Sequence, residues 1–306
     1  MPDLYDGPIV DAHHHVWDLS LGRHPWLAPE GRVAHRYGDY APITHDYLPA
    51  DYRRDIAGTG IVASVYMEAE WAPGDGLAEV AVVERYREQT GVPGAMVAQA
   101  WLDAPDAGEQ LVALAAVPAV KSVRHKPGGA TSPAEGEAGV RSLLSDEAWR
   151  AGYGRLADHG LHFDLQTPWW NLGEARRLAD DFPATTLVID HAGVLASRDA
   201  ETLVAWRAAL AHVAEATNVV IKASGLCVAG TPWTVDANRG PILDLVDVFG
   251  ADRVMFGSNF PVDGMFVSLP GLVDGYREIL ADLDPAAQRA VFHDTAQRVY
   301  APQPLG

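Results

Sequence analysis

The stretch IVDAHHHVWD, residues 9–18, begins with a short apolar run that ends in a cluster of histidines. Similar runs, rich in β-branched residues, recur on average about every 35 residues along the chain. Such runs are typical of buried β-strands. The sequence therefore predicts strands over residues 9–13, 61–68, 95–102, 120–124, 161–166, 186–191, 218–224 and 253–257.

Most of these runs are separated by segments rich in Ala, Leu, Arg and Glu with a helical pattern. The segments are residues 77–90, 109–116, 146–159, 172–181, 201–217, 241–249 and 285–300. Strands and helices that alternate at this spacing indicate parallel βαβ units, and eight such units close into a barrel. We predict an α/β fold, a single-domain (β/α)₈ TIM barrel over residues 1–306. An open doubly wound sheet is the alternative, but no G-x-G-x-x-G follows the first strand.

Composition and charge exclude several classes of protein. The chain has 306 residues, 48% of them hydrophobic, and a formal net charge of −18. A surface this acidic repels phosphates, so we expect neither a nucleic-acid partner nor binding to a membrane. Cys227 is the single cysteine, and the N-terminus has neither a basic region nor a long apolar run. We expect a cytoplasmic protein, and leave monomer and homodimer open.

Two segments are too long to be simple connections. Residues 17–55 follow the first strand and are rich in Pro, His and Tyr; residues 126–139 follow the fourth and are rich in Gly, Pro and Ala. In a barrel, both loops lie at the C-terminal end of the strands, where active sites are built. We expect these long loops to act as lids or pocket walls rather than as plain surface excursions.

Histidines lie at the ends of the first and sixth strands. Alternate residues of a strand share a face, so Asp11, His13 and His15 are expected on one side and His14 on the other. Two histidines at i and i+2 just past a strand can bind one divalent metal. His191 ends the sixth strand at the same level, whereas its neighbour Asp190 is expected to point outward in a structural role.

Other polar residues end most of the remaining strands. Barrel interiors are packed mainly with branched apolar side chains, so polar groups that converge at one end indicate a site. Glu68 would be a buried acid aimed at the mouth, and Arg124 suits a substrate carboxylate or a developing oxyanion. Lys222 is either paired inside the barrel or functional. The further candidates for binding substrate are His125, Gln166, Trp101 and Trp169, although single tryptophans often serve only packing.

Seven segments together show a resemblance to a known family. They are IVDAHHHVWD (9–18), HPWL (24–27), LPADYRRDI (48–56), VKSVRHKPG (120–128), VIDHAG (189–194), NVVIKASGL (218–226) and DRVMFGSNFPVD (252–263). In these segments the sequence resembles the amidohydrolase superfamily. It is most similar to the branch of TIM-barrel hydrolases that includes L-fuconolactonase, L-rhamnonolactonase and pyrone-dicarboxylate lactonase. The resemblance implies a hydrolase that opens a lactone of a sugar acid or of a carboxylated ring by water attack.

The resemblance also implies roles for individual residues. His13, His15 and His191 match the family's histidines and are its metal ligands if a metal is bound; Arg124 matches an arginine that meets acidic substrates. Asn259 stands where most relatives have the aspartate that acts as general base. Asparagine cannot take a proton at neutral pH. Another base must then act, and Glu68, Asp263 and one of the histidines are the candidates, in that order.

The sequence lacks the fifth-strand metal histidine of other amidohydrolases, because that strand ends at Gln166. A two-metal site is therefore not expected. One divalent metal, zinc or manganese, and metal-independent action both remain open. So do two alternatives to lactone hydrolysis. One is a decarboxylase, a hydratase or an amide or ester hydrolase with an atypical base. The other is a barrel that binds a small lactone or carboxylate without catalysis.

Overall fold

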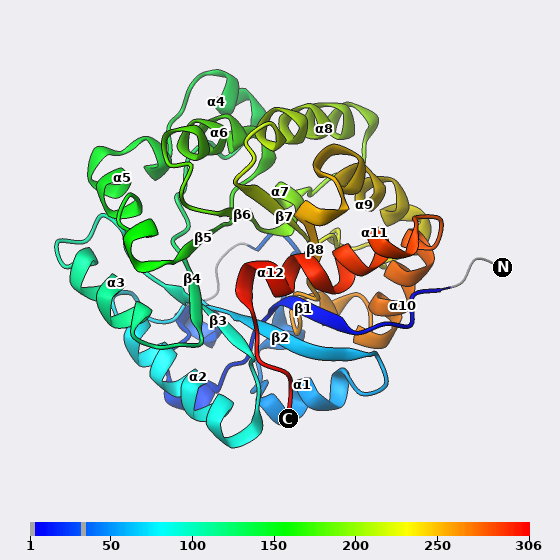
Figure 1. The fold of residues 1–306 in the computed structure, drawn as a ribbon, viewed down its shortest axis with the longest axis horizontal. Helices are drawn as coiled ribbons and strands as arrows, with labels where there is room; N and C mark the ends of the chain where they lie inside the picture. The colour runs from blue at the N-terminus through cyan, green and yellow to red at the C-terminus, as the bar shows by residue number, and fades with distance from the viewer. Residues whose placement is uncertain (1–3, 32–34) are drawn as a thin grey trace.

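A computed structural model describes residues 4–31 and 35–306, and in it eight parallel strands form one sheet in the order β1 to β8. Beyond the last strand the sheet returns to the first. The backbone N–H of Asn259 donates to the carbonyl of His13 at 2.7 Å, and that of His15 donates to the carbonyl of Phe260 at 2.8 Å. The described residues thus form a nearly closed (β/α)₈ barrel, as predicted, with helices ringed around the strands (Figure 1).

The strands lie where the sequence places them. They are β1 Ile9–His14, β2 Ile61–Met67, β3 Ala95–Gln99, β4 Val120–Arg124, β5 His162–Leu165, β6 Leu187–Ile189, β7 Val219–Ala223 and β8 Val254–Phe256. Several end earlier than predicted, as β6 does before Asp190 and His191. Polar residues just past these ends still bond to the neighbouring strands: the backbone N–H of Glu68 donates to the carbonyl of Val97 at 3.0 Å, and that of Asp190 to the carbonyl of Leu165 at 2.9 Å.

The helices also follow the pattern, with α1, α4, α7 and α10 as additions that the sequence analysis did not predict. They are α1 Pro49–Asp55, α2 Gly76–Thr90, α3 Ala107–Ala115, α4 Pro133–Glu137, α5 Glu147–Tyr153, α6 Leu172–Asp181, α7 His191–Val194, α8 Ala200–Ala214, α9 Val235–Phe249, α10 Leu269–Leu280, α11 Pro285–Arg289 and α12 Thr295–Tyr300. Helix α9 starts before its predicted boundary at Pro241, because Thr234 caps it by accepting from the N–H of Ala237. Within residues 4–31 and 35–306, no helix is long and apolar enough to cross a membrane.

The C-terminal helix closes one end of the barrel. Helices α11 and α12 are joined by a π-helical turn, Ala290–Asp294, and α12 crosses the end of the strand ring in Figure 1. Val299 and Tyr300 pack with the apolar side chains inside the barrel, among them Val10 and Val65. The Tyr300 hydroxyl also donates to Oδ1 of Asp164 at 2.7 Å. This end is therefore filled, and only the C-terminal end of the strands can hold a site.

The two long loops contain short helical turns. The loop after β1 forms 3₁₀ turns at Leu19–Leu21, Pro25–Leu27, Pro29–Gly31 and Ala41–Ile43; its residues 32–34 lie outside the described residues. The loop after β4 contains α4. Side chains from both loops line the cavities at the mouth, as expected.

The bond between α12 and the barrel interior can be tested by the substitution Tyr300→Phe. The change removes a hydrogen bond to a fully buried carboxylate, and such bonds contribute about 1.5–3 kcal/mol. We expect a loss of this size in the free energy of unfolding, measured by denaturant titration. Tyr86→Phe is the control, because no hydrogen bond from the Tyr86 hydroxyl is found among the described residues. Equal effects of the two substitutions would show that the Tyr300 bond does not anchor α12.

Candidate active site

An irregularity in β1 decides where its histidines point. Between Asp11 and His14 the register with β2 shifts, and His14 pairs with Tyr66 where a regular strand would place His13. Asp11 therefore turns toward the helices, where it accepts from the hydroxyl of Tyr52 at 2.8 Å. Nδ1 of His13 instead lies 3.4 Å from Oδ1 of Asp190, inside the barrel. The prediction that Asp11 shares a face with His13 and His15 is wrong because of this bulge.

His14 points away from the other two histidines, as predicted. Its ring stacks on that of Tyr52 with centroids 3.9 Å apart, and its Nε2 lies 3.1 Å from the hydroxyl of Ser64. His14 therefore helps to pack β1 and β2 against α1.

A lysine between two aspartates lies inside the barrel. Nζ of Lys222 is 2.5 Å from Oδ1 of Asp164 and 3.2 Å from Oδ1 of Asp190, and all three side chains are fully buried. The hydroxyl of Ser122 donates to the second oxygen of Asp164 at 2.5 Å. Of the two roles considered for Lys222, the structure shows pairing. The side chain lines none of the cavities at the mouth, contrary to the prediction that it contacts substrate.

Asp190 connects this pair to the mouth of the barrel. Its second carboxylate oxygen lies 3.5 Å from Nη1 of Arg124. Burial alone would raise the pKa of Asp190, but Lys222 and then His13 hold that pKa well below its usual value. Burial also lowers the pKa of His13 to about 3, although Asp190 opposes the shift. At neutral pH Asp190 is therefore an anion and His13 is neutral. The prediction that Asp190 points outward is wrong, because its carboxylate faces Lys222 and His13 inside the barrel.

Arg124 and Glu68 form a tight pair. Nε of Arg124 donates to Oε1 of Glu68 at 2.5 Å, and Nη2 donates to the backbone carbonyl of Glu68 at 2.7 Å. Nη1 donates to Gln166 at 3.1 Å. The other carboxylate oxygen of Glu68 accepts from the N–H of Glu70 at 2.8 Å. Both oxygens of Glu68 are thus engaged, so the geometry does not favour it as the free general base.

A small polar chamber lies above this pair. Its volume is about 50 Å³, enough for about one or two water molecules. Its walls come from β-strand ends and from both long loops. They consist of His15, Trp26, His35, Arg36, Ala69, Glu70, Arg124, Lys126, Gln166, His191, Asn259 and Val262. The structure therefore brings together most of the predicted catalytic residues; His13 lies beneath, with its ring 5.2 Å from that of His15 and 4.4 Å from that of His191.

Two of the three histidines of the chamber, His15 and His191, are held by different partners. Nδ1 of His15 lies 2.9 Å from the carbonyl of Met67. A carbonyl only accepts, so Nδ1 carries the proton and Nε2 presents a lone pair. Nδ1 of His191 lies 3.1 Å from the hydroxyl of Ser224, which can donate or accept. Burial lowers the pKa of both rings well below 6.5, so both are neutral at pH 7.

Asn259 is oriented by a buried acid. It has a left-handed backbone with φ of 55°, a conformation that asparagine tolerates better than most residues. Its Nδ2 donates to Oδ1 of Asp263 at 2.7 Å, so its Oδ1 is left as an acceptor. Asp263 does not line the chamber, and Tyr37 and Cys227 also hydrogen-bond to it. Asp263 thus braces Asn259 and has no direct contact with the chamber through which to act as base.

Arg36 is a functional candidate that the sequence analysis missed. Its Nη2 donates to the hydroxyl of Tyr37 at 2.7 Å, while its Nη1 is buried and has no hydrogen-bond partner among the described residues. Arg36 therefore brings an unused cationic donor to the chamber wall. It lies in a loop without a periodic pattern, and no local signal in the sequence distinguishes it from a surface arginine.

An aromatic cleft of about 350 Å³ adjoins the chamber. The two share Trp26, Glu70, Arg124 and Lys126. The remaining walls of the cleft are Pro25, Gly31, Glu68, Trp71, Pro73, Gln99, Trp101 and His125. The structure thus places the predicted binding residues Trp101 and His125 in the cleft and Gln166 in the chamber.

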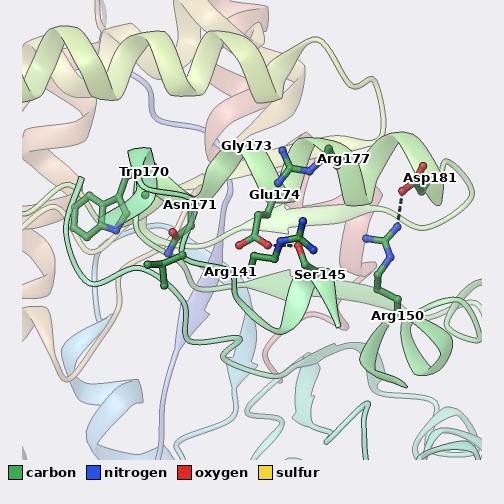
Figure 2. Close-up of a pocket in the computed structure, with 12 residues that line it drawn as sticks. Arg141, Ser145, Arg150, Trp170, Asn171, Gly173, Glu174, Arg177 and Asp181 are labelled. Carbon is green, nitrogen blue, oxygen red and sulfur yellow. Dashed lines mark hydrogen bonds and ion pairs between the residues drawn. The ribbon is translucent and has the colours of Figure 1, made fainter. Parts of the chain in front are cut away.

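Trp169 does not belong to this mouth, contrary to the prediction. It is 8% exposed and lines a separate cavity beside α8. A larger cavity, about 680 Å³, lies between α6 and the loop that precedes α5 (Figure 2). Within it, Arg150 pairs with Asp181, and Glu174 accepts from the hydroxyl of Ser145. None of the predicted site residues lines this cavity, so size alone does not identify the site.

The histidines carry ring nitrogens that could coordinate a metal. His13 has two buried ring nitrogens without hydrogen bonds, and Nε2 of His15 is free to coordinate. However, the part of the chain that the structure describes contains no group of three His, Cys, Asp or Glu side chains placed to hold a metal ion. The cations Lys222 and Arg124 act on His13, and Asn259 carries no negative charge. As arranged, these residues do not fit a metal ion.

Comparisons with known proteins agree with this fold. A family model described as "Amidohydrolase" matches residues 10–301. An uncharacterized protein, y4mH, from Sinorhizobium fredii is 30% identical over 97% of this chain and 99% of its own length. An L-fucono-1,5-lactonase from Burkholderia multivorans is 27% identical over 96% of this chain and 97% of its own.

A solved structure supports the architecture. An amidohydrolase from Burkholderia multivorans, crystallised with bound zinc, superposes with a TM-score of 0.79. It is 24% identical and covers 97% of this chain and all of its own. At this identity the likeness concerns the fold, and the zinc belongs to that protein.

The bond between Asn259 and Asp263 predicts a pH-dependent defect in the variant Asn259→Asp. Burial already raises the pKa of Asp263 to about 6. A second carboxylate at 2.7 Å makes the two groups share one proton. A raised folded-state pKa means that stability is present at low pH and is lost as pH rises through that pKa. We expect the variant's deficit in unfolding free energy to grow from pH 5 to pH 8, by at most about 1.4 kcal/mol per pH unit.

Asn259→Ala is the matched control, because it removes the donor without adding a carboxylate. Its deficit should change less with pH. A deficit of Asn259→Asp that is the same at pH 5 and pH 8 would contradict the proposed contact between the two carboxylates.

Proposed function

The chain belongs to the amidohydrolase family, and we propose that it is a hydrolase that opens a lactone ring by attack of water. The family and an L-fucono-1,5-lactonase relative support hydrolysis of this kind. The observation that carries the proposal is the chamber, in which two neutral histidines face an arginine with an unused donor. A neutral base opposite a fixed cation is what water attack on a carbonyl requires.

In this proposal His15 is the general base. Its Nδ1 is tied to the carbonyl of Met67, so its Nε2 lone pair can take a proton from a water molecule in the chamber. The oxygen of that water bonds to the lactone carbonyl carbon. When the bond from this carbon to the ring oxygen breaks, the ring oxygen takes the proton from His15. The product is the open hydroxy acid.

Arg36 and Asn259 would both support this reaction, Arg36 at the carbonyl oxygen and Asn259 at the attacking water. Nη1 of Arg36 would stabilise the negative charge that develops on the carbonyl oxygen, because it belongs to a cation, is buried and has no hydrogen-bond partner among residues 4–31 and 35–306. Oδ1 of Asn259 can accept the second hydrogen of the attacking water and so orient it, since Nδ2 of Asn259 is bound to Asp263. In this arrangement Asn259 positions the water, and His15 transfers the proton.

The metal question has a direct test on the protein purified without a histidine tag. We expect a panel of lactones to be opened at the same rate before and after treatment with a chelator, because the described ligands form no metal group. Metal content by mass spectrometry and acid release with a pH indicator are the measurements. Loss of turnover on chelation, restored by zinc or manganese, would instead make His13, His15 and His191 a metal site that rearranges on binding.

The same panel separates the competing functions. Carbon dioxide release from aromatic acids without lactone opening would favour a decarboxylase. Ligand binding without any turnover would favour a barrel that lost its catalytic function.

The role of His15 predicts an unusual pH profile. Burial lowers its pKa well below 6.5, so it remains an unprotonated base as the pH falls through 6.5. We expect kcat/KM for a lactone, corrected for spontaneous hydrolysis, to stay level from pH 7.5 to below pH 6.5. The variant His15→Asn should lose about 10²–10⁴-fold in kcat. His212→Asn, on an exposed residue of α8, is the control and should retain full activity. An activity midpoint near 6.5 would point to an exposed histidine as the base.

A further inference from the structure

The aromatic cleft is the part of the mouth that the proposed chemistry leaves unused. Three indoles, of Trp26, Trp71 and Trp101, line it, and Trp101 is 36% exposed. A volume of about 350 Å³ lies in the range of small-molecule sites. Because the cleft shares walls with the chamber, a substrate whose carbonyl enters the chamber can place a second group in the cleft. The chemistry of the cleft walls therefore determines which substituent a substrate can carry.

The polar side chains of the cleft are already engaged with one another. Glu68 is paired with Arg124, and Glu70 with Lys126. Gln99 uses both ends of its amide. Its Nε2 donates to the carbonyl of Trp71 at 3.2 Å, and its Oε1 accepts from Nε1 of Trp101 at 3.3 Å.

The indole N–H groups are engaged as well. Nε1 of Trp26 donates to the carbonyl of Ala69 at 2.9 Å, and Nε1 of Trp101 donates to Gln99. The surfaces left for a ligand are therefore mainly ring faces. A ring face accepts an apolar or aromatic group but cannot satisfy a hydroxyl.

His125 adds a hydrogen-bond donor to this surface. Its Nδ1 lies 3.0 Å from Nε1 of Trp149 and 3.3 Å from the N–H of Leu102, and both of these groups donate. Nδ1 must therefore be the acceptor, which places the proton on Nε2. The ring of His125 lies against that of Trp101, with centroids 4.7 Å apart. A ligand on Trp101 thus has a defined N–H donor beside it.

We propose that the substrate is a lactone carrying an aromatic or branched apolar substituent with a hydrogen-bond acceptor beside it, rather than a polyhydroxylated sugar lactone. This inference rests on the proposed lactone hydrolysis. The substituent lies on the indoles of the cleft, its acceptor meets Nε2–H of His125, and the lactone carbonyl enters the chamber. A sugar lactone would bring several hydroxyls to groups that already have partners, and a desolvated hydroxyl without a partner weakens binding.

The test compares two lactones of the same ring size, one with a phenyl ketone substituent and one with hydroxyls. We expect kcat/KM to be higher for the phenyl ketone lactone by about tenfold or more. Trp101→Ala should lower kcat/KM for that substrate by about tenfold, mainly by raising KM, because the contact exists before and during the reaction. Trp101→Phe keeps an aromatic face and should recover most of the loss. Val204→Ala, at a residue of α8 that is 72% exposed, is the control.

A binding measurement separates this inference from the proposed hydrolysis. The cyclic amide that carries the same phenyl ketone substituent is not readily hydrolysed, and its binding can be followed by calorimetry. Binding that Trp101→Ala weakens, without turnover of either lactone, would support the cleft assignment and overturn lactone hydrolysis. Faster opening of the hydroxylated lactone, with no binding of the cyclic amide, would overturn the cleft assignment and leave hydrolysis in place. Absence of both binding and turnover would overturn both.

Discussion

The ion pair between Lys222 and its two aspartates is the constraint on which the mouth of the barrel depends. It joins the interior faces of β5, β6 and β7, and all three side chains are fully buried. Removal of one partner from such a group typically costs about 3–5 kcal/mol, because an uncompensated charge remains. Tyr300 of α12 and Ser122 of β4 complete the hydrogen bonds of Asp164. The same carboxylates therefore tie the closed end of the barrel to the floor of the site.

Asp190 links this ion pair to the residues nearer the mouth of the barrel. It faces the ring of His13 and the guanidinium of Arg124, and Arg124 in turn holds Glu68. The charges of Asp190, Arg124 and Glu68 therefore offset one another in the floor of the site. The free groups lie one layer higher, at His15, Asn259 and Arg36. The most conspicuous charged residues of the strands thus serve as support, while a loop arginine brings a guanidinium nitrogen that has no hydrogen-bond partner among the described residues.

In the function proposed above, chemistry and selectivity are separated in space. The chamber is small and polar and is built mainly from strand ends, whereas the cleft is larger and aromatic and draws on the loops after β1 and β2. Trp26, Glu70, Arg124 and Lys126 belong to both. With this arrangement, changes in the loops can alter the group accepted in the cleft without moving the histidines, as is common in barrels whose loops vary.

The sequence by itself determined the barrel, the level at which polar residues leave the strands, and the cluster of His15, His191, Arg124 and Asn259. These follow from local signals, namely apolar runs, their spacing and their polar ends. Only the tertiary structure decided that Asp11 turns outward at a bulge, that Lys222 and Glu68 are already paired, and that Trp169 lies elsewhere. It also decided that Nη1 of Arg36 has no hydrogen-bond partner among the described residues. The physical reason is that availability depends on partners distant in sequence. Lys222 and Asp164 are 58 residues apart, and Tyr300 and Asp164 are 136 apart. No local pattern reports such a pairing.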